Sequence, residues 1–136
     1  GQVVLPEALE WSGVAVIKEA YRIYKERGYT TRLLSAANRN VYHWCEILGG
    51  DLVQTINYSW HKRLNSCDVE VKDRMADQVP EVYMNELNKI EEFHKSFEEN
   101  GMKPEEFVTY GGFRDTLTTF IAGYDDLCKL IRGYMI

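Results

Sequence analysis

The chain has 136 residues, of which 45% are hydrophobic and 27% are charged, and it contains only 3 prolines. This composition is typical of a globular domain and excludes a disordered or collagen-like segment. A chain of this length can bury enough surface to form a core without disulfides or metals. The 16 Lys and Arg against 21 Asp and Glu give a formal net charge of -5, and no Lys/Arg run exceeds two residues. Charge therefore argues against a nucleic-acid partner.

The cysteines indicate a reducing compartment. Cys45, Cys67 and Cys128 are odd in number, widely spaced and without a C-x-x-C pair, so we expect free thiols and a cytoplasmic protein. No apolar stretch approaches 18 residues and no signal segment stands at the start, so we expect neither membrane insertion nor secretion. The first residue is Gly1 and not Met, and we expect the chain to be part of something longer.

The first predicted helix covers residues 13–27. Its apolar residues recur at steps of three and four, with charged residues on the opposite face. The apolar stripe consists of Val14, Ile17, Tyr21 and Tyr24. Gly28 follows in the position that a helix C-cap favours.

Two short strands are predicted next, within residues 30–37 and 51–56. The segment 40–48 between them reads as a helix, with Asn38 or Asn40 as its N-cap and a Gly-Gly pair at its end. A strand, helix and strand in so few residues predict a β-α-β unit with parallel strands and a right-handed crossover. A two-stranded parallel sheet is not stable alone, so these strands need neighbours.

The remainder of the chain is helical by pattern. We predict a long amphipathic helix over residues 80–100, a short helix that starts at Pro104, and a last helix after Gly111 and Gly112. The last helix carries an apolar stripe that suits packing against a further surface, formed by Leu117, Phe120, Tyr124, Leu127, Ile131 and Tyr134. The predicted fold class is α/β and mostly helical, with two parallel strands and about five helices.

The order and spacing of residues from Gly13 onward resemble the transaldolase family. The sharpest element is Arg39-Asn40 after a strand, followed about ten residues later by Gly50-Asp51 before the next strand. Residues in the tail are similar to the helices that close this family's barrel, namely Phe107, Asp115, Leu117, Phe120, Gly123, Leu127, Leu130 and Ile131. The resemblance covers most of the chain.

This resemblance implies a C-terminal fragment of a (β/α)8 TIM barrel. Residues 13–65 would be its last βα units and residues 66–136 its closing helices, because a whole barrel needs about 200 to 250 residues. Family members move a dihydroxyacetone unit between sugar phosphates through a Schiff base on a lysine of the fourth strand. That strand is absent, so we assign no catalytic residue and no cofactor. Lys18, Lys25 and Lys62 lie in helix-like or polar sequence, whereas a Schiff-base lysine must be desolvated.

The resemblance also implies that the fragment carries the phosphate end of the site. In such barrels the loops after the last two strands commonly hold the phosphate. Arg39 matches the family's arginine, and Asn38 and Asn40 flank it, so the three are our candidate ligands for a sugar phosphate. Ala37 stands where the family has a serine, and Asn38 where it has an aromatic residue. The structural alternative is a solvated arginine beside a helix start.

Asn57 and Ser59 follow the second strand and are candidates for a wall of the site. Tyr58 and Trp60, which lie among them, would narrow a site or pack in a core or interface. His43, Cys45 and His61 have metal-capable atoms but no third ligand at useful spacing, so we expect no metal. Cys128 reads as a small packing residue and not as a nucleophile.

Two functions remain open at this stage. The first is the C-terminal part of a transaldolase-like enzyme, inactive alone. The second is a non-catalytic helical oligomerisation or interaction module derived from a barrel. Both predict a homo-oligomer, because the strands and the last helix expose apolar faces that recruit partners.

Overall fold

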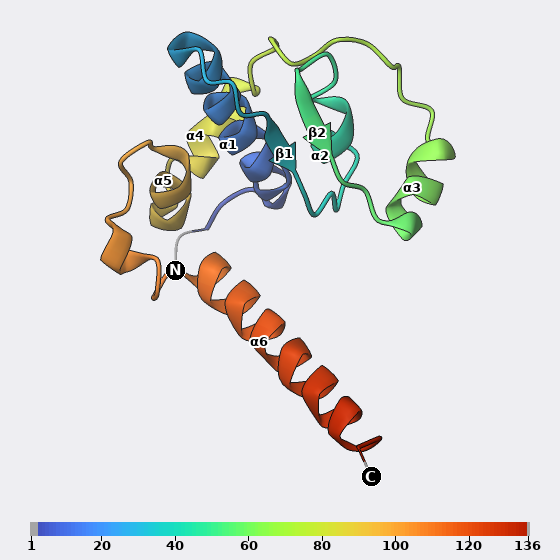
Figure 1. Cartoon of the computed structure of the whole chain (residues 1–136). Helices are drawn as coiled ribbons and strands as arrows, with labels where there is room; N and C mark the ends of the chain where they lie inside the picture. Colours follow the sequence, from blue (N-terminus) through green and yellow to red (C-terminus); the bar gives the residue numbers. More distant parts are fainter. Residues whose placement is uncertain (1–2, 136) are drawn as a thin grey trace. The chain divides into compact units, whose positions relative to one another are not determined.

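The computed structural model describes residues 3–135. The chain divides into two compact units, the first ending at Glu99 and the second beginning at Asn100. The first unit contains α1 (Pro6–Arg27), β1 (Leu33–Ser35), α2 (Tyr42–Cys45), β2 (Leu52–Gln54), α3 (Tyr58–Asn65), α4 (Glu81–Leu87) and α5 (Glu91–Phe97), as Figure 1 shows. The second unit contains a short 3-10 helix, η1 (Pro104–Glu106), and α6 (Gly111–Arg132). The predicted α/β, mostly helical class with two parallel strands is confirmed.

Helix α1 is the central element of the first unit. It begins at Pro6, earlier than the predicted start at Gly13, because Ala8 and Trp11 continue the buried stripe toward the N-terminus. Pro6 occupies the first helical turn, where its missing N–H costs nothing. The helix ends at Gly28, whose φ of 64° is left-handed and favours glycine, as the sequence predicts.

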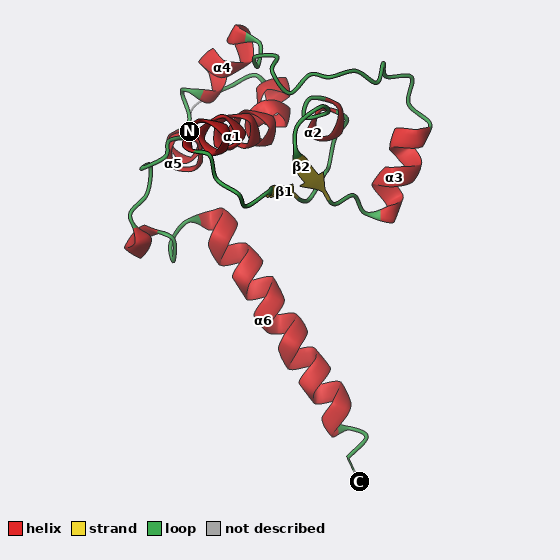
Figure 2. Ribbon diagram, turned by 45° about the horizontal axis from the view of Figure 1, so that its top comes forward, coloured by secondary structure: helices red, strands yellow, loops and turns green. Residues whose placement is uncertain are grey.

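The core consists of two clusters that share α1. One cluster joins Ala8, Trp11, Val14 and Ala15 of α1 to Leu87 of α4 and Phe93 of α5. The other joins Ile47, Leu52 and Met75, with Ile17 and Tyr21 of α1 packed against them. In Figure 2, α1 accordingly lies next to α4 and α5, while α2 lies beside β2. The N-terminal half of α1 thus packs on helices and its C-terminal half on the sheet.

Strands β1 and β2 pair in parallel, which confirms the predicted β-α-β pairing. The register sets Leu33 opposite Leu52 and Leu34 opposite Val53. Leu52 is buried and Leu33 half-buried on the side that α1 covers, whereas Leu34 and Val53 are exposed. Because successive strand residues point to opposite faces, the described part of the first unit covers only one face of this sheet.

Two predicted helices differ from the structure. The helix expected over residues 40–48 is a single turn, Tyr42–Cys45, followed by turns as far as Gly49. The helix expected over residues 80–100 breaks into α4 and α5 at the extended Ile90 (φ -103°, ψ 115°). In a continuous helix Leu87 and Phe93 would lie about 120° apart around the axis. The break turns both side chains into the core beside α1.

The second unit confirms the two predicted C-terminal helices. Pro104 begins η1 at the first helical position, and Glu106 reaches back to accept a hydrogen bond from the Lys103 backbone N–H at 2.8 Å. Helix α6 is amphipathic, yet none of its residues is buried. We call its apolar face the α6 stripe, formed by Phe113, Leu117, Phe120, Tyr124, Leu127 and Ile131, all of them exposed.

Candidate functional site

The loop of residues 36–41 leaves the carboxyl end of β1 with an unusual backbone. Ala37 has a φ of 57°, the left-handed conformation that residues other than glycine rarely adopt. Such strain persists only where the surroundings hold it, and it gathers at functional sites. The next three residues, Asn38, Arg39 and Asn40, are the candidate ligands from the sequence.

Asn38 fastens this loop to the end of the neighbouring strand. Its side chain is 1% exposed, and its Nδ2 donates to the carbonyl of Thr55 at 2.9 Å. Thr55 follows β2 directly, so the bond joins the carboxyl ends of both strands. The Asn38 Oδ1 atom is buried with no hydrogen-bond donor in the described part of the chain. Buried polar atoms without a hydrogen-bond partner are rare in native proteins.

Asn40 fixes the other side of the loop to two helices. Its Oδ1 accepts from the His43 backbone N–H at 2.8 Å, and its Nδ2 donates to the Glu10 carbonyl of α1 at 3.1 Å. The Arg39 backbone N–H donates to His43 Nδ1 at 3.3 Å. The loop is therefore tied to Thr55 after β2, to α1 and to α2, whereas Asn38 Oδ1 and the Arg39 side chain have no partner in the described part of the chain.

The Arg39 side chain is exposed and has no ion-pair partner among residues 3–135. Within the described part of the first unit, only Arg39, Lys62 and Arg63 lack a carboxylate partner. Lys62 and Arg63 instead lie over the rings of Tyr58 and Trp60. All three cations follow the carboxyl ends of β1 and β2.

The segments that follow β1 and β2 carry no acidic side chain of their own, and Glu10 of α1 is the carboxylate whose charge acts on His43 at the loop. The stretches 33–45 and 52–67 contain neither Asp nor Glu, although the whole chain carries a net charge of -5. Cations that no nearby carboxylate neutralises raise the local concentration of anions. This end of the sheet can therefore attract an anionic group.

The predicted wall residues form the N-terminus of α3. Asn57 is its N-cap, and its Oδ1 accepts from the Trp60 backbone N–H at 3.0 Å and from Ser59 Oγ at 2.8 Å. Asn57 Oδ1 and the Ser59 hydroxyl are thus engaged in capping. Tyr58 is 73% exposed, which excludes it from the core of the first unit. Whether Asn57 and Ser59 face a ligand stays a prediction.

Sequence reasoning missed His43 as part of this site, because it was read only as a metal-capable side chain. The signal available was the Asn40-x-x-His43 spacing, which is that of a helix cap. Burial lowers the pKa of His43 below its usual value, although the carbonyls of Glu10 and Ala37 act in the opposite direction. The ring is consequently neutral at pH 7, as an Nδ1 acceptor must be.

No three His, Cys, Asp or Glu side chains within residues 3–135 converge as a metal site. His43 and Cys45 belong to the single turn of α2, where Cys45 is buried and its pKa is raised by burial. His61 lies on α3, and its Nε2 atom is 3.4 Å from Nδ2 of Asn65. Cys128 lies next to the α6 stripe as a free thiol.

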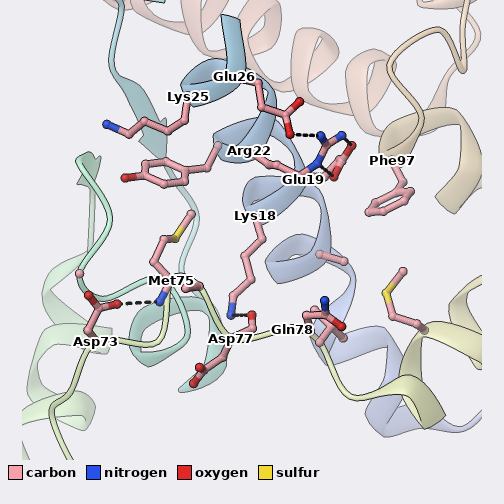
Figure 3. Close-up of a pocket in the computed structure, with 16 residues that line it drawn as sticks. Lys18, Glu19, Arg22, Lys25, Glu26, Asp73, Met75, Asp77, Gln78 and Phe97 are labelled. Carbon is pink, nitrogen blue, oxygen red and sulfur yellow. Dashed lines mark hydrogen bonds and ion pairs between the residues drawn. The ribbon is translucent and has the colours of Figure 1, made fainter. Parts of the chain in front are cut away.

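A cavity of about 680 Å³ lies on the C-terminal half of α1 (Figure 3). It is lined by α1, by the segment 73–79 and by Phe97 of α5, and by Gly49 just before β2. It includes no residue of the loops that leave the carboxyl ends of the strands. In open and closed α/β folds, ligands bind at those carboxyl ends, so the cavity is at the wrong end of the sheet for a substrate.

The charges around this cavity neutralise one another. Arg22 bonds to Glu19 and Glu26, and Lys18 Nζ donates to the carbonyls of Arg74 at 2.8 Å and Asp77 at 2.6 Å. Burial lowers the pKa of Lys18 despite the carboxylate of Glu46 at 3.7 Å, which acts to raise it. The two bonds of Lys18 hold the turn around Met75 against α1. They indicate a structural role for Lys18.

A protein-family model matches most of the chain. The family model described as transaldolase/fructose-6-phosphate aldolase matches residues 5–131, from the beginning of α1 to the end of α6. The chain belongs to this family. The resemblance stated from the sequence is confirmed, and the match to the transaldolase family includes both strands and the Asn38–Arg39–Asn40 loop.

Comparisons with curated proteins and with solved structures give no significant match. Family membership therefore rests on the transaldolase family model alone. In the described residues no helix is both long and apolar enough to cross a membrane.

Proposed function

We propose that this chain is the C-terminal portion of a transaldolase-like enzyme and supplies the phosphate-binding end of its site. In the intact enzyme a dihydroxyacetone unit would pass between sugar phosphates through a Schiff base. Arg39 would bind the phosphate, with Asn38 and Asn40 beside it and Asn57 and Ser59 as a wall. The observation that carries this proposal is the unpaired Arg39 guanidinium on a loop whose neighbours are all tied down.

The chemistry of this loop suits a phosphate dianion. A guanidinium presents paired donors that match two phosphate oxygens. Holding the backbone fixed before binding lowers the entropy lost on association. Helix α2 is only one turn long, so its dipole contributes little. Affinity must then come from Arg39, from backbone N–H groups near Asn40 and Val41, and from the local excess of positive charge.

The uncovered sheet face supports the fragment part of the proposal. Parallel sheets are almost always covered on both faces, whereas Leu34 and Val53 are exposed here. Further strands of a barrel would extend the sheet and bury that face. The proposed barrel strands would also bring the Schiff-base lysine, since Lys18 is held by backbone carbonyls at the opposite end of the sheet. We therefore propose that the chain alone is inactive.

The free cysteines favour a cytoplasmic location for this proposed enzyme, and its Schiff-base chemistry needs no cofactor. The α6 stripe favours a second candidate, a non-catalytic helical oligomerisation module. Under both candidates we propose a homo-oligomer in which the α6 stripe is buried, because exposed apolar faces of this size recruit partners. Twofold pairing is the commonest closed arrangement.

Titration with a ketose phosphate tests the proposal. Wild type should bind, and Arg39→Ala should lose affinity by about 1.5 to 3 kcal/mol, the value of a hydrogen bond to a charged group. Arg32→Ala is the matched control, because Arg32 is an exposed arginine at the other end of β1, paired with Asp51 at 2.9 Å. Equal affinity of wild type and Arg39→Ala would remove Arg39 from the site and leave the oligomerisation module.

A further inference from the structure

His43 contacts both the Arg39 loop and α1. Its Nδ1 accepts the Arg39 backbone N–H at 3.3 Å, while its own backbone N–H donates to Asn40 Oδ1 at 2.8 Å. The ring lies against Gly13 of α1, where an added Cβ would come within 3.4 Å of Nε2. A glycine at this point gives the half-buried imidazole room between the helix and the loop.

We propose that neutral His43 is a positioning residue of the anion site, and that protonation of its imidazole releases the backbone of Arg39 and weakens anion binding. The inference rests on the proposed function of Arg39 and adds to it a dependence on pH. His43 does not touch the anion in this account. It acts through the loop whose backbone it holds.

The hydrogen bonds that Nδ1 can form differ between the two protonation states of the ring. In the neutral ring with its proton on Nε2, Nδ1 carries a lone pair and accepts from Arg39. In the imidazolium both ring nitrogens are donors, so the bond to the Arg39 N–H is lost. The protonated Nδ1 can turn to the Ala37 carbonyl, which faces the ring, but the Arg39 N–H is left without the acceptor that held it.

The groups that face the ring come from α1 and from the loop. Burial favours the neutral ring most strongly, and the positive charge of Arg39 favours it too. The carbonyls of Glu10 on α1 and of Ala37 in the loop favour the charged ring, as does the negative charge of Glu10. The balance holds the pKa of His43 below its usual value, so the release occurs at a lower pH than the titration of an unperturbed histidine.

The test measures the affinity for inorganic sulfate and the NMR signal of the Arg39 amide from about pH 8 to about pH 5. Sulfate remains a dianion over this range, so a change in affinity reports on the protein. The full chain is compared with His43→Asn, whose side-chain oxygen accepts a hydrogen bond but does not titrate, and with His43→Leu, which has no acceptor. His94→Asn is the control, because the pKa of His94 is raised by Asn88 and Glu98, far from the loop in sequence.

We expect wild type and His94→Asn to lose sulfate affinity by about three- to tenfold on acidification, the range for one hydrogen bond. The Arg39 amide signal should move with the same midpoint. His43→Asn should bind at a constant affinity, and His43→Leu should bind weakly at every pH. Suppose that Arg39→Ala loses binding while the wild-type affinity for sulfate stays constant or rises in acid. This result would overturn the inference about His43 but not the proposed function of Arg39. No sulfate binding by wild type at any pH would overturn the proposed function as well.

Discussion

Leu34 of β1 lies directly opposite Val53 of β2, and the two side chains are 55% and 40% exposed. Their sequence neighbours Leu33 and Leu52 pack against α1 on the other face of the sheet. One side of a parallel ladder is therefore a core and the other is an apolar surface. In α/β proteins, helices usually cover both faces of a parallel sheet.

The two faces should respond differently to substitution. Leu34→Thr places a β-branched residue, which suits a strand, on the exposed face, so the free energy of unfolding should change by no more than about 0.5 kcal/mol. Leu52→Ala removes buried methyl groups and should lower it by about 2 to 4 kcal/mol. Urea denaturation of both variants measures the difference. A cost above about 2 kcal/mol for Leu34→Thr would mean that this face is covered in solution.

The α6 stripe should mediate self-association. Phe120 is 74% exposed and Tyr124 67% exposed, which is unfavourable for aromatic rings in water. Wild type should sediment as a dimer or higher oligomer, and Tyr124→Asp should dissociate it by burying a charge in the interface. Ala122→Asp, on the opposite side of the same helix, is the matched control and should not. A compact monomeric wild type at low micromolar concentration would disprove this prediction.

The chain alone should form no Schiff base. Lys18 is the lysine most shielded from water that could mimic an activated amine, but its Nζ is hydrogen-bonded to two carbonyls and lies beside Glu46. Borohydride reduction in the presence of a ketose phosphate should therefore leave the protein mass unchanged. Lys18→Met is the informative variant if an adduct forms. A stoichiometric adduct that Lys18→Met abolishes would show that this chain carries a reactive lysine of its own.

Local signals in the sequence predicted most of the fold. Gly28 predicted the end of α1, because the chain there takes the left-handed backbone conformation that glycine adopts readily. Pro104 predicted the start of η1. The break at Ile90 had no such signal, because neither glycine nor proline stands between Leu87 and Phe93. It results from packing both side chains against α1, which is a tertiary effect.

The candidate site was predicted only in part for a similar reason. Arg39, Asn38 and Asn40 follow a strand, and their proximity in sequence made them one site. The bond of Asn38 to Thr55 and that of Asn40 to Glu10 join segments that are 17 and 30 residues apart. Local spacing does not encode such contacts. The spacing of Asn40 and His43 is that of a helix cap, but the bond from the Arg39 N–H to His43 Nδ1 depends on how the loop folds back, which the sequence does not specify.

The most direct measurement is an NMR titration of the labelled chain with inorganic phosphate, because it locates the bound anion. We expect shifts in the backbone amides of residues 38–41, with smaller shifts at the start of α3, and none at the same phosphate concentration in Arg39→Ala. We also expect no shifts around Lys18 and Gly49, which line the cavity at the other end of the sheet. Shifts confined to that cavity, or shifts at residues 38–41 that persist in Arg39→Ala, would contradict the central claim that Arg39 forms the anion site.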